Sequence, residues 1–277
     1  MARKKAGKEI ATWDEELAKY AEAAAAAEAN AGGGQFFGLK GGILTWQDSP
    51  MPDNEIPVII LDSIFENVFF EGDYDPDNPS GPTCFAFARK EDDLAPHEIV
   101  VKAEQHQSVG SCEDCEHNEW GSAERGRGKA CRNTRRLSMI PAGSFDRNGD
   151  LEFIDEPSHY ENTTMGFMKL PVTSVNGYAS FVKQIAGALR RPPFGIITRL
   201  RVIPDNKTQF RVLFEPIDNV PVELKDVIMT RVEEARRTID FPYQLNDDDY
   251  EAPAQKSKSG GKKAVTKKKT TRRGKKY

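Results

Sequence analysis

The spacing of apolar residues along the chain predicts a folded region dominated by β-strands. Residues 56–61 form a continuous apolar run, the pattern of a strand buried on both faces, and residues 63–71 form a second run rich in Phe and Val. Residues 35–40 and 42–46 are short β-prone segments separated by glycines, which predicts a hairpin. Turn residues separate the other expected strands, at 83–87, 135–140, 151–154, 164–172, 194–203 and 209–214.

Helical periodicity is confined to a few segments. Residues 174–189 carry their apolar positions on one stripe and are stopped by two prolines, and a last helix is expected from Pro221 to Thr238. Residues 1–34 predict an N-terminal helical arm, since a capping box at its start is followed by an alanine-rich run. Residues 243–277 have almost no apolar content, and we expect a disordered tail there, first acidic and then basic.

This order of elements predicts a β-rich α+β fold in residues 35–242. Several short strands with one helix inserted late suit a small barrel that resembles the oligonucleotide-binding fold. Residues 89–133 form a long polar loop, and a loop of that length inside a compact domain needs something to hold it. We therefore expect the barrel to carry a metal-knuckle loop insertion at residues 84–131, and two peripheral helices.

Charge is distributed very unevenly along the chain. The 277 residues include 39 Lys and Arg and 43 Asp and Glu, for a net charge of −4. The segment from Lys256 to Lys276 holds 11 of the basic residues and no acid, which leaves 28 basic against 43 acidic residues in the remainder. A body this acidic is not expected to bind duplex DNA over a broad surface, although one local basic groove could hold a strand.

The sequence shows neither a membrane span nor a secretion signal. No run approaches the roughly 18 apolar residues that a transmembrane helix requires, and the basic N-terminus is not followed by an apolar segment. We therefore expect an intracellular protein with no membrane partner. In that compartment cysteines stay reduced and are free to serve purposes other than disulfides.

The four cysteines have the spacing of a metal site. Cys112 and Cys115 form a C-x-x-C pair, Cys131 follows in the same polar loop, and Cys84 lies just after a turn-rich segment. Four thiolates of this kind suit a tetrahedral Zn²⁺, which would pin the loop to a strand edge and supply folding energy. His117 is the nearest substitute ligand. An iron–sulfur cluster and four unrelated buried cysteines are the alternatives.

A basic stretch surrounds the last cysteine. Twelve residues, 125–136, contain no acid and have glycines between their cations, so the backbone can approach phosphates closely. Trp120, just before this stretch, is a candidate platform on which a base could stack. The alternative is a solvated loop whose cations pair with nearby acids. The candidate nucleic-acid-binding residues are Trp120, Arg125, Arg127, Lys129, Arg132, Arg135 and Arg136.

Motifs of catalysis are missing from the sequence. It contains no glycine-rich phosphate loop, no G-x-S-x-G and no H-E-x-x-H, so we predict that the protein is not an enzyme. Carboxylates such as Asp62, Glu66 and Glu98 could be combined into a metal-dependent nuclease site. An acidic chain of this size always permits such a combination, so the nuclease is the weaker alternative.

Two segments resemble a class of phage proteins. The sequences EGDYDPDNPSGPTCFAF and CEDCEHNEWGSAERGRGKACRNTRRL, together with the N-terminal WDEELAKYAEAAAAAE, are similar to predicted single-stranded DNA-binding proteins of phage replication and recombination modules. The resemblance covers about half of the chain. It implies that the four cysteines bind metal and that the protein coats DNA strands in the cytoplasm of the host cell. One departure is the basic C-terminus, because better-known single-strand binders end in an acidic tail that recruits partners.

The sequence thus predicts a single-stranded DNA-binding accessory protein, with phage replication or recombination proteins as further partners. The alternative is a virion or scaffold interaction protein in which zinc is purely structural and the basic tail neutralises DNA. In that case the tail alone would account for any affinity for DNA. A tail-deleted chain therefore separates the two interpretations.

Overall fold

The computed structural model describes the greater part of the first of two compact units, residues 1–246 and 247–277. The expected N-terminal arm and almost all of the expected tail lie outside the described residues. No helix in the described part is long and apolar enough to cross a membrane. The described residues are 36–72, 81–103, 110–124, 126–206 and 208–243.

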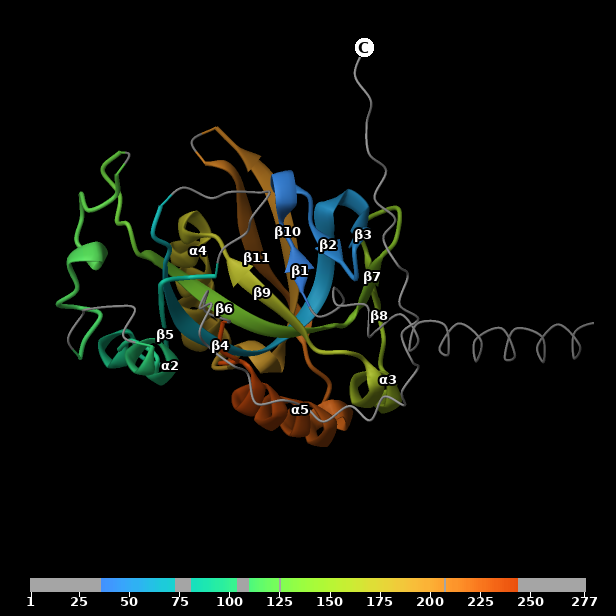
Figure 1. The fold of residues 1–277 in the computed structure, drawn as a ribbon. Coiled ribbons are helices and arrows are strands. Elements are labelled where there is room, and N and C mark those ends of the chain that lie inside the picture. The colour runs from blue at the N-terminus through green and yellow to red at the C-terminus, as the bar shows by residue number, and fades with distance from the viewer. Residues whose placement is uncertain (1–35, 73–80, 104–109, 125, 207, 244–277) are drawn as a thin grey trace, which may run out of the picture. The chain divides into compact units, whose positions relative to one another are not determined.

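A six-stranded antiparallel sheet forms the centre of the fold (Figure 1). Its strands are β4 (Glu55–Phe69), β5 (Cys84–Ala88), β6 (Arg132–Pro141), β9 (Gly166–Leu170), β10 (Ile196–Asp205) and β11 (Gln209–Asn219). The order is β11-β10-β4-β6-β9. The long strand β4 pairs with β6 along one edge, and along the other edge first with β10 and then with β5.

The sheet stays open, which corrects the expected barrel. Within the described residues β9 and β11 are the two ends of the strand order and do not pair with each other, so no closed barrel is found. The β-rich α+β class is confirmed. Two small sheets accompany the main one, the first formed by β1 (Phe37–Gly38), β2 (Thr45–Trp46) and β3 (Ser49–Pro50), the second by β7 (Gly143–Phe145) and β8 (Leu151–Phe153).

Strand β4 joins the two apolar runs that the sequence separated. A β-bulge between Ile60 and Asp62 inserts one extra residue opposite β6, so the strand continues through its polar centre. The bulge also shifts which face each side chain occupies. Ile60 belongs to one hydrophobic cluster and Ile64, four residues later, to the cluster on the opposite face.

Helices cover both faces of the sheet. Tyr178 and Phe181 of α4 pack with Val58 and Ile60 in one cluster, whereas Ile228 of α5 belongs to the cluster of the opposite face. A π-helical turn at Ile185–Leu189 extends α4, and a 3₁₀ turn at Val222–Leu224 precedes α5, which confirms both helices expected from the periodicity. The α-helices are α2 (Glu98–Lys102), α3 (Pro157–Asn162), α4 (Val172–Gln184) and α5 (Lys225–Thr238).

The N-terminal hairpin closes one end of the core. Phe37 of β1 stacks on Trp46 of β2 with ring centroids 4.3 Å apart, and both rings lie over Gly166 of β9. A side chain at Gly166 would overlap both rings, so only glycine allows this approach. The hairpin expected from the glycine-separated segments is therefore confirmed, and it contacts the sheet through a position without a side chain.

A buried ionic network lies on the α5 side of the sheet. Arg136 Nε donates to Glu66 Oε2 at 3.1 Å, Lys169 Nζ lies 3.4 Å from Glu66 Oε1, and the Tyr243 hydroxyl donates to the same carboxylate. Glu66 is fully buried and Arg136 is 3% exposed. Burial alone would raise the pKa of Glu66, but the charges of Arg136 and Lys169, with hydrogen bonds from Arg136 and Tyr243, hold it below its usual value.

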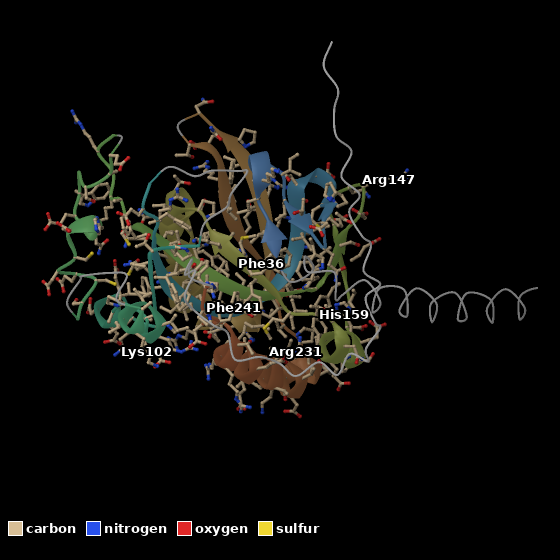
Figure 2. The ribbon with its side chains drawn as sticks, in the orientation of Figure 1. Phe36, Lys102, Arg147, His159, Arg231 and Phe241 are labelled. Carbon is tan, nitrogen blue, oxygen red and sulfur yellow. The ribbon has the colours of Figure 1, made fainter. Side chains whose placement is uncertain are left out.

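The network also attaches the end of the described chain to the sheet. Arg136 Nη1 donates to the carbonyls of Ile239 at 3.0 Å and Phe241 at 2.8 Å, and the guanidinium lies 4.1 Å from the Phe241 ring centroid. Phe241 makes edge contacts with Phe36 and Phe167 (Figure 2). The segment after α5 is therefore held by a charge on β6 rather than by apolar contacts alone.

Replacing Gly166 with alanine should destabilise the protein, because the new methyl group overlaps the rings of Phe37 and Trp46. We expect a loss of about 1–3 kcal/mol in the free energy of unfolding, measured by urea denaturation. Gly187→Ala is the matched control, since nothing lies within 4 Å of a methyl group at that position. Equal stabilities for the two variants would contradict the close packing described for the hairpin.

Glu66→Gln should destabilise the protein at neutral pH by about 3 kcal/mol, because it leaves the charge of Arg136 buried without a counter-charge. The folded-state pKa of Glu66 is depressed. The stability that the ionised Glu66 contributes is therefore fully present above its unfolded-state pKa of about 4.3. That stability is lost as the pH falls through the lower, folded-state pKa. The difference between wild type and variant should shrink on acidification below about pH 4.

The matched control for this experiment is Glu233→Gln on α5, which removes the charge of an exposed ion pair with Arg237 at 3.5 Å. We expect a change within about 0.5 kcal/mol, since exposed pairs contribute little. A difference between wild type and Glu66→Gln that stays constant from pH 7 to pH 3 would show that the carboxylate charge does not carry the effect.

Candidate metal centre and nucleic-acid interface

We call residues 110–131 the knuckle. Cys112 and Cys115 belong to it, and Cys131 ends it directly before β6. Cys84 opens β5 and stands opposite Phe69, at the far end of β4. The four cysteines therefore lie at the starts of two strands and in the loop that joins those strands.

All four cysteines line one small cavity. It has a volume of about 10 Å³ and is also lined by Asn67, Asn118 and His117. That volume is on the order of the space that one water molecule occupies. Each cysteine is at most 9% exposed, and all four are free thiols. A cavity of this size holds nothing larger than a single ion or water molecule.

The thiols influence one another electrostatically. Burial, together with the negative charges that Cys112, Cys131 and Cys115 would carry, raises the pKa of Cys84 to about 12. Burial and the charges of Cys112 and Cys115 raise the pKa of Cys131 to about 12. Without a cation the thiols of Cys84, Cys112 and Cys131 therefore stay protonated at neutral pH, and a bound cation would reverse this preference.

The described residues do not yet form a closed ligand cage. Among them, no three His, Cys, Asp or Glu side chains stand in metal-binding geometry. All four cysteines nevertheless line one cavity. Ion binding would therefore require their side chains to rearrange, while the chain path that brings them to this cavity is already in place.

Asparagines connect the cavity to the sheet and the knuckle. Asn133 Nδ2 donates to Asn67 Oδ1 at 2.7 Å and to Asn118 Oδ1 at 2.9 Å, and Asn118 Nδ2 donates to the carbonyl of Cys112 at 2.7 Å. The Asn67 amide faces the thiol of Cys112, and its pull opposes the rise that burial causes in the pKa of that thiol. Asn67 Nδ2 is buried without an oxygen or nitrogen partner, the position of a donor to a thiolate.

Sequence reasoning missed this asparagine cluster. The available signal was Asn67 within an apolar run, because asparagine is depleted in strands and is buried only where it has polar partners. Asn133 pairs directly opposite it in β6. The two strands therefore supply the polar floor on which the knuckle rests.

Backbone hydrogen bonds close the knuckle on itself. Gly121 N donates to the Gly128 carbonyl at 2.9 Å, and Cys131 N donates to the His117 carbonyl at 2.7 Å. The return of the chain leaves Trp120 at the tip, where its side chain is 80% exposed. Lys129 Nζ lies 5.9 Å from the centre of that ring. The Trp120 ring is therefore exposed to solvent with a cation beside it, an arrangement on which a nucleic-acid base could stack.

A groove separates the knuckle from the end of β4. It has a volume of about 440 Å³, and we call it the knuckle groove. Phe69 stacks on His117 at 4.0 Å on one wall, and the Arg132 guanidinium lies 5.6 Å from the Phe70 ring on another. Aromatic rings next to cations are the surfaces on which single-stranded nucleic acids are held. The remaining lining residues include Glu71, Gly72, Ser122, Ala123, Glu124, Lys129 and Ala130.

Two of the seven predicted nucleic-acid-binding residues line this groove, and two more lie on the same loop. Lys129 and Arg132 line it, Trp120 lies next to Lys129, and Arg127 is exposed on the same loop. Arg125 lies outside the described residues. Phe69 and Phe70 line the groove and also pack against the small apolar cluster that contains Val68 and Phe85.

The two remaining arginines lie elsewhere, and we leave them out of the interface. Consecutive side chains of a strand point to opposite faces of the sheet, so Arg135 and Arg136 of β6 separate. Arg136 is directed into the interior, where Glu66 and two carbonyls use its guanidinium. Arg135 enters a pocket on the α4 side.

Comparison with known proteins identifies no relative of this chain. No family model, no curated protein and no solved structure matches the chain.

Proposed function

We propose that the protein is a non-enzymatic accessory protein that binds single-stranded DNA through the knuckle groove. The observation that carries the proposal is the exposed ring of Trp120 beside Lys129, on a loop whose cysteines converge on one cavity. Bases would stack on Trp120 and Phe70, and phosphates would contact Lys129, Arg132 and the neighbouring Arg127.

We further propose that Zn²⁺ occupies the cysteine cavity and fixes the knuckle against the sheet. The donor set fits this ion, since four sulfurs meet the tetrahedral preference of zinc and leave no position open for catalysis. The unpartnered amide of Asn67 would donate to the Cys112 thiolate. Zinc would therefore preorder the groove and reduce the entropy lost when a strand binds.

Preference for single strands follows from the same features. An exposed ring can stack only on bases that are not already stacked in a duplex. The acidic body disfavours the broad phosphate contacts of a duplex binder, so binding is limited to the local groove. The phage replication or recombination role rests on the sequence resemblance, and the basic residues from Lys256 onward would add a sequence-independent electrostatic contact.

The purified protein should contain about one zinc ion per chain and show no visible absorbance. Cys112→Ser or Cys131→Ser should remove most of the zinc, because each replaces a thiolate by a much weaker ligand. Elemental analysis measures the metal content, and an absorbance spectrum detects an iron–sulfur cluster.

Ser111→Ala is the control for this experiment, because Ser111 neighbours Cys112 but does not line the cavity. His117→Gln separates a site of four cysteines from one in which the histidine replaces a sulfur, since His117 lines the same cavity. Brown protein that contains iron would show that the cysteines hold an iron–sulfur cluster instead of zinc. Protein without metal after expression in zinc-supplemented medium would refute the metal centre.

Trp120→Ala should weaken binding to an oligothymidine strand roughly 5- to 150-fold, the value of one stacked base. Replacing Arg127 and Arg132 with alanine should weaken binding further at low salt. It should also flatten the dependence of log Kd on log salt by about 1.4, the change expected for two lost phosphate contacts. Fluorescence anisotropy titrations at several salt concentrations measure both quantities.

Arg147→Ala is the matched control, since Arg147 is exposed on the β7–β8 turn, away from α2 and Lys102 (Figure 2). A chain that ends at Asp249 separates the groove from the basic tail, and it should still prefer single-stranded over duplex DNA. If that shortened chain binds no DNA while Trp120→Ala in the full chain binds normally, the tail is the binding site and the scaffold interpretation is favoured.

A further inference from the structure

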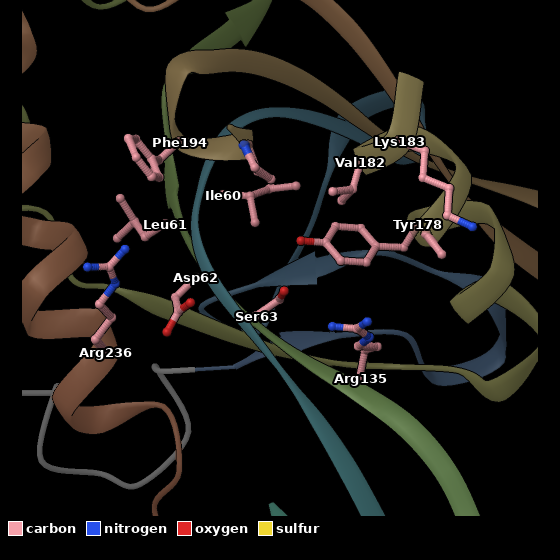
Figure 3. A pocket seen from close by; sticks show the side chains of 12 residues that line it. Ile60, Leu61, Asp62, Ser63, Arg135, Tyr178, Val182, Lys183, Phe194 and Arg236 are labelled. Atoms are coloured by element: carbon pink, nitrogen blue, oxygen red, sulfur yellow. The ribbon is translucent and has the colours of Figure 1, made fainter. Parts of the chain in front are cut away.

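A second pocket opens where the sheet is interrupted beside β4. On that edge, β10 pairs with β4 as far as Val58 and β5 begins to pair at Phe65, so no described strand pairs with the stretch between them. The β-bulge lies in this stretch. A pocket of about 330 Å³ lies here, between β4, α4 and the 3₁₀ turn at Pro193–Gly195 (Figure 3). This volume is in the range of small-molecule sites.

Arg135 is the most unusual group in this pocket. Its guanidinium stacks on the Phe65 ring at 3.4 Å from the centroid and lies 6.0 Å from the centre of the Tyr178 ring. Arg135 Nε is buried without a hydrogen-bond partner. No ion pair of this guanidinium is found among the described residues, although the charge of Glu91 acts on it from a greater distance. A buried arginine donor of this kind is costly unless a ligand completes it.

The charge balance of the pocket favours an anion. Its one carboxylate, Asp62, is already engaged by Arg89, whose Nη1 contacts both oxygens at 2.9 and 2.7 Å. Lys183 and Arg236 also line the pocket, and both are exposed. The cationic side chains of Arg135, Lys183 and Arg236 are therefore left without a balancing acid from the lining.

The walls select a ligand with a flat apolar body. Apolar side chains of Ile60, Val182 and Phe194 form much of the lining. The Tyr178 hydroxyl points across the pocket toward β4, where it pairs with Ser63 (Figure 3). An apolar wall with a phenol and a serine hydroxyl at one end, and an arginine below them, matches a molecule with a ring at one end and an anion at the other.

We propose that this pocket binds a nucleoside monophosphate, with the phosphate at Arg135 and the base against the wall formed by Ile60, Val182 and Phe194. Arginine suits this role because its planar guanidinium contacts phosphate with two parallel hydrogen bonds. The nucleotide is either free or the 5′-phosphorylated end of a DNA strand. The site is separate from the knuckle groove and does not depend on zinc or on Trp120.

The test is calorimetric titration of the full-length protein with thymidine 5′-monophosphate. Arg135→Met should weaken binding about 10-fold or more, because a charge-assisted contact is lost. Lys183→Met should weaken nucleotide binding several-fold. Because Lys183 is exposed, this variant should fold normally and keeps the test valid if Arg135→Met fails to fold. Arg236→Met should weaken binding, whereas the adjacent Arg237→Met should not, since only Arg236 lines the pocket.

Two further ligands test the assigned chemistry. Thymidine without phosphate and inorganic phosphate should each bind at least 10-fold more weakly than the nucleotide. Inorganic phosphate that binds as tightly as the nucleotide would overturn the assigned base subsite. No heat of binding with millimolar nucleotide, or equal affinity in wild type, Arg135→Met and Lys183→Met, would overturn the proposal.

The source of the nucleotide follows from a comparison of oligothymidine with and without a 5′-phosphate. Tighter binding of the phosphorylated strand that disappears in Lys183→Met supports a strand end in the pocket. Equal binding of the two strands, with nucleotide binding retained, supports a free nucleotide. Trp120→Ala should leave nucleotide affinity unchanged, so this proposal and the proposed strand binding can fail independently.

Discussion

The fold depends on one strand that is buried on both faces and contacts three other strands. β4 runs for 15 residues, and its apolar first half is covered by helices on either side. Such a strand cannot place a polar group without supplying that group with partners. Three polar positions of β4 consequently belong to distinct arrangements: Asp62 with Arg89 at the pocket, Glu66 in the ionic network, and Asn67 beside the thiols. One strand thus contributes residues to the second pocket, to the ionic network and to the cysteine cavity.

Hydrophobic periodicity predicted the elements well, because burial acts locally on each segment. The apolar run at 56–61, the stripe at 174–189 and the hairpin around residue 206 all appear in the structure. Periodicity could not predict whether the sheet closes into a barrel. An antiparallel sheet with these strands can close or stay open, and the decision lies in pairings between segments distant in sequence, such as β9 with β6. The loop before β6 also contains α2, too short to show periodicity.

The candidate site was predicted in its composition but only partly in its geometry. Clustering of the cysteines around one cavity follows from their spacing and from strand ends meeting at one edge. The basic stretch misled at Arg135 and Arg136, because both lie in the strand expected at 135–140 and were nevertheless grouped with the cations of the preceding loop. Alternation then directs one side chain into the interior and its neighbour into a pocket. The extra residue at Leu61 similarly defeats any assignment of faces from alternation alone.

The contact between Arg136 and the segment after α5 has a consequence for biosynthesis. Arg136 and Glu66 emerge from the ribosome well before Ile239, Phe241 and Tyr243, which complete the hydrogen bonds of the guanidinium and carboxylate. Until those residues are synthesised, the charge pair of Glu66 and Arg136 stays exposed to water, because the segment that covers it in the folded protein is still missing. This face of the sheet is therefore buried only late in translation. Nascent chains should pass through a partly folded form with an exposed sheet face, which chaperones could recognise.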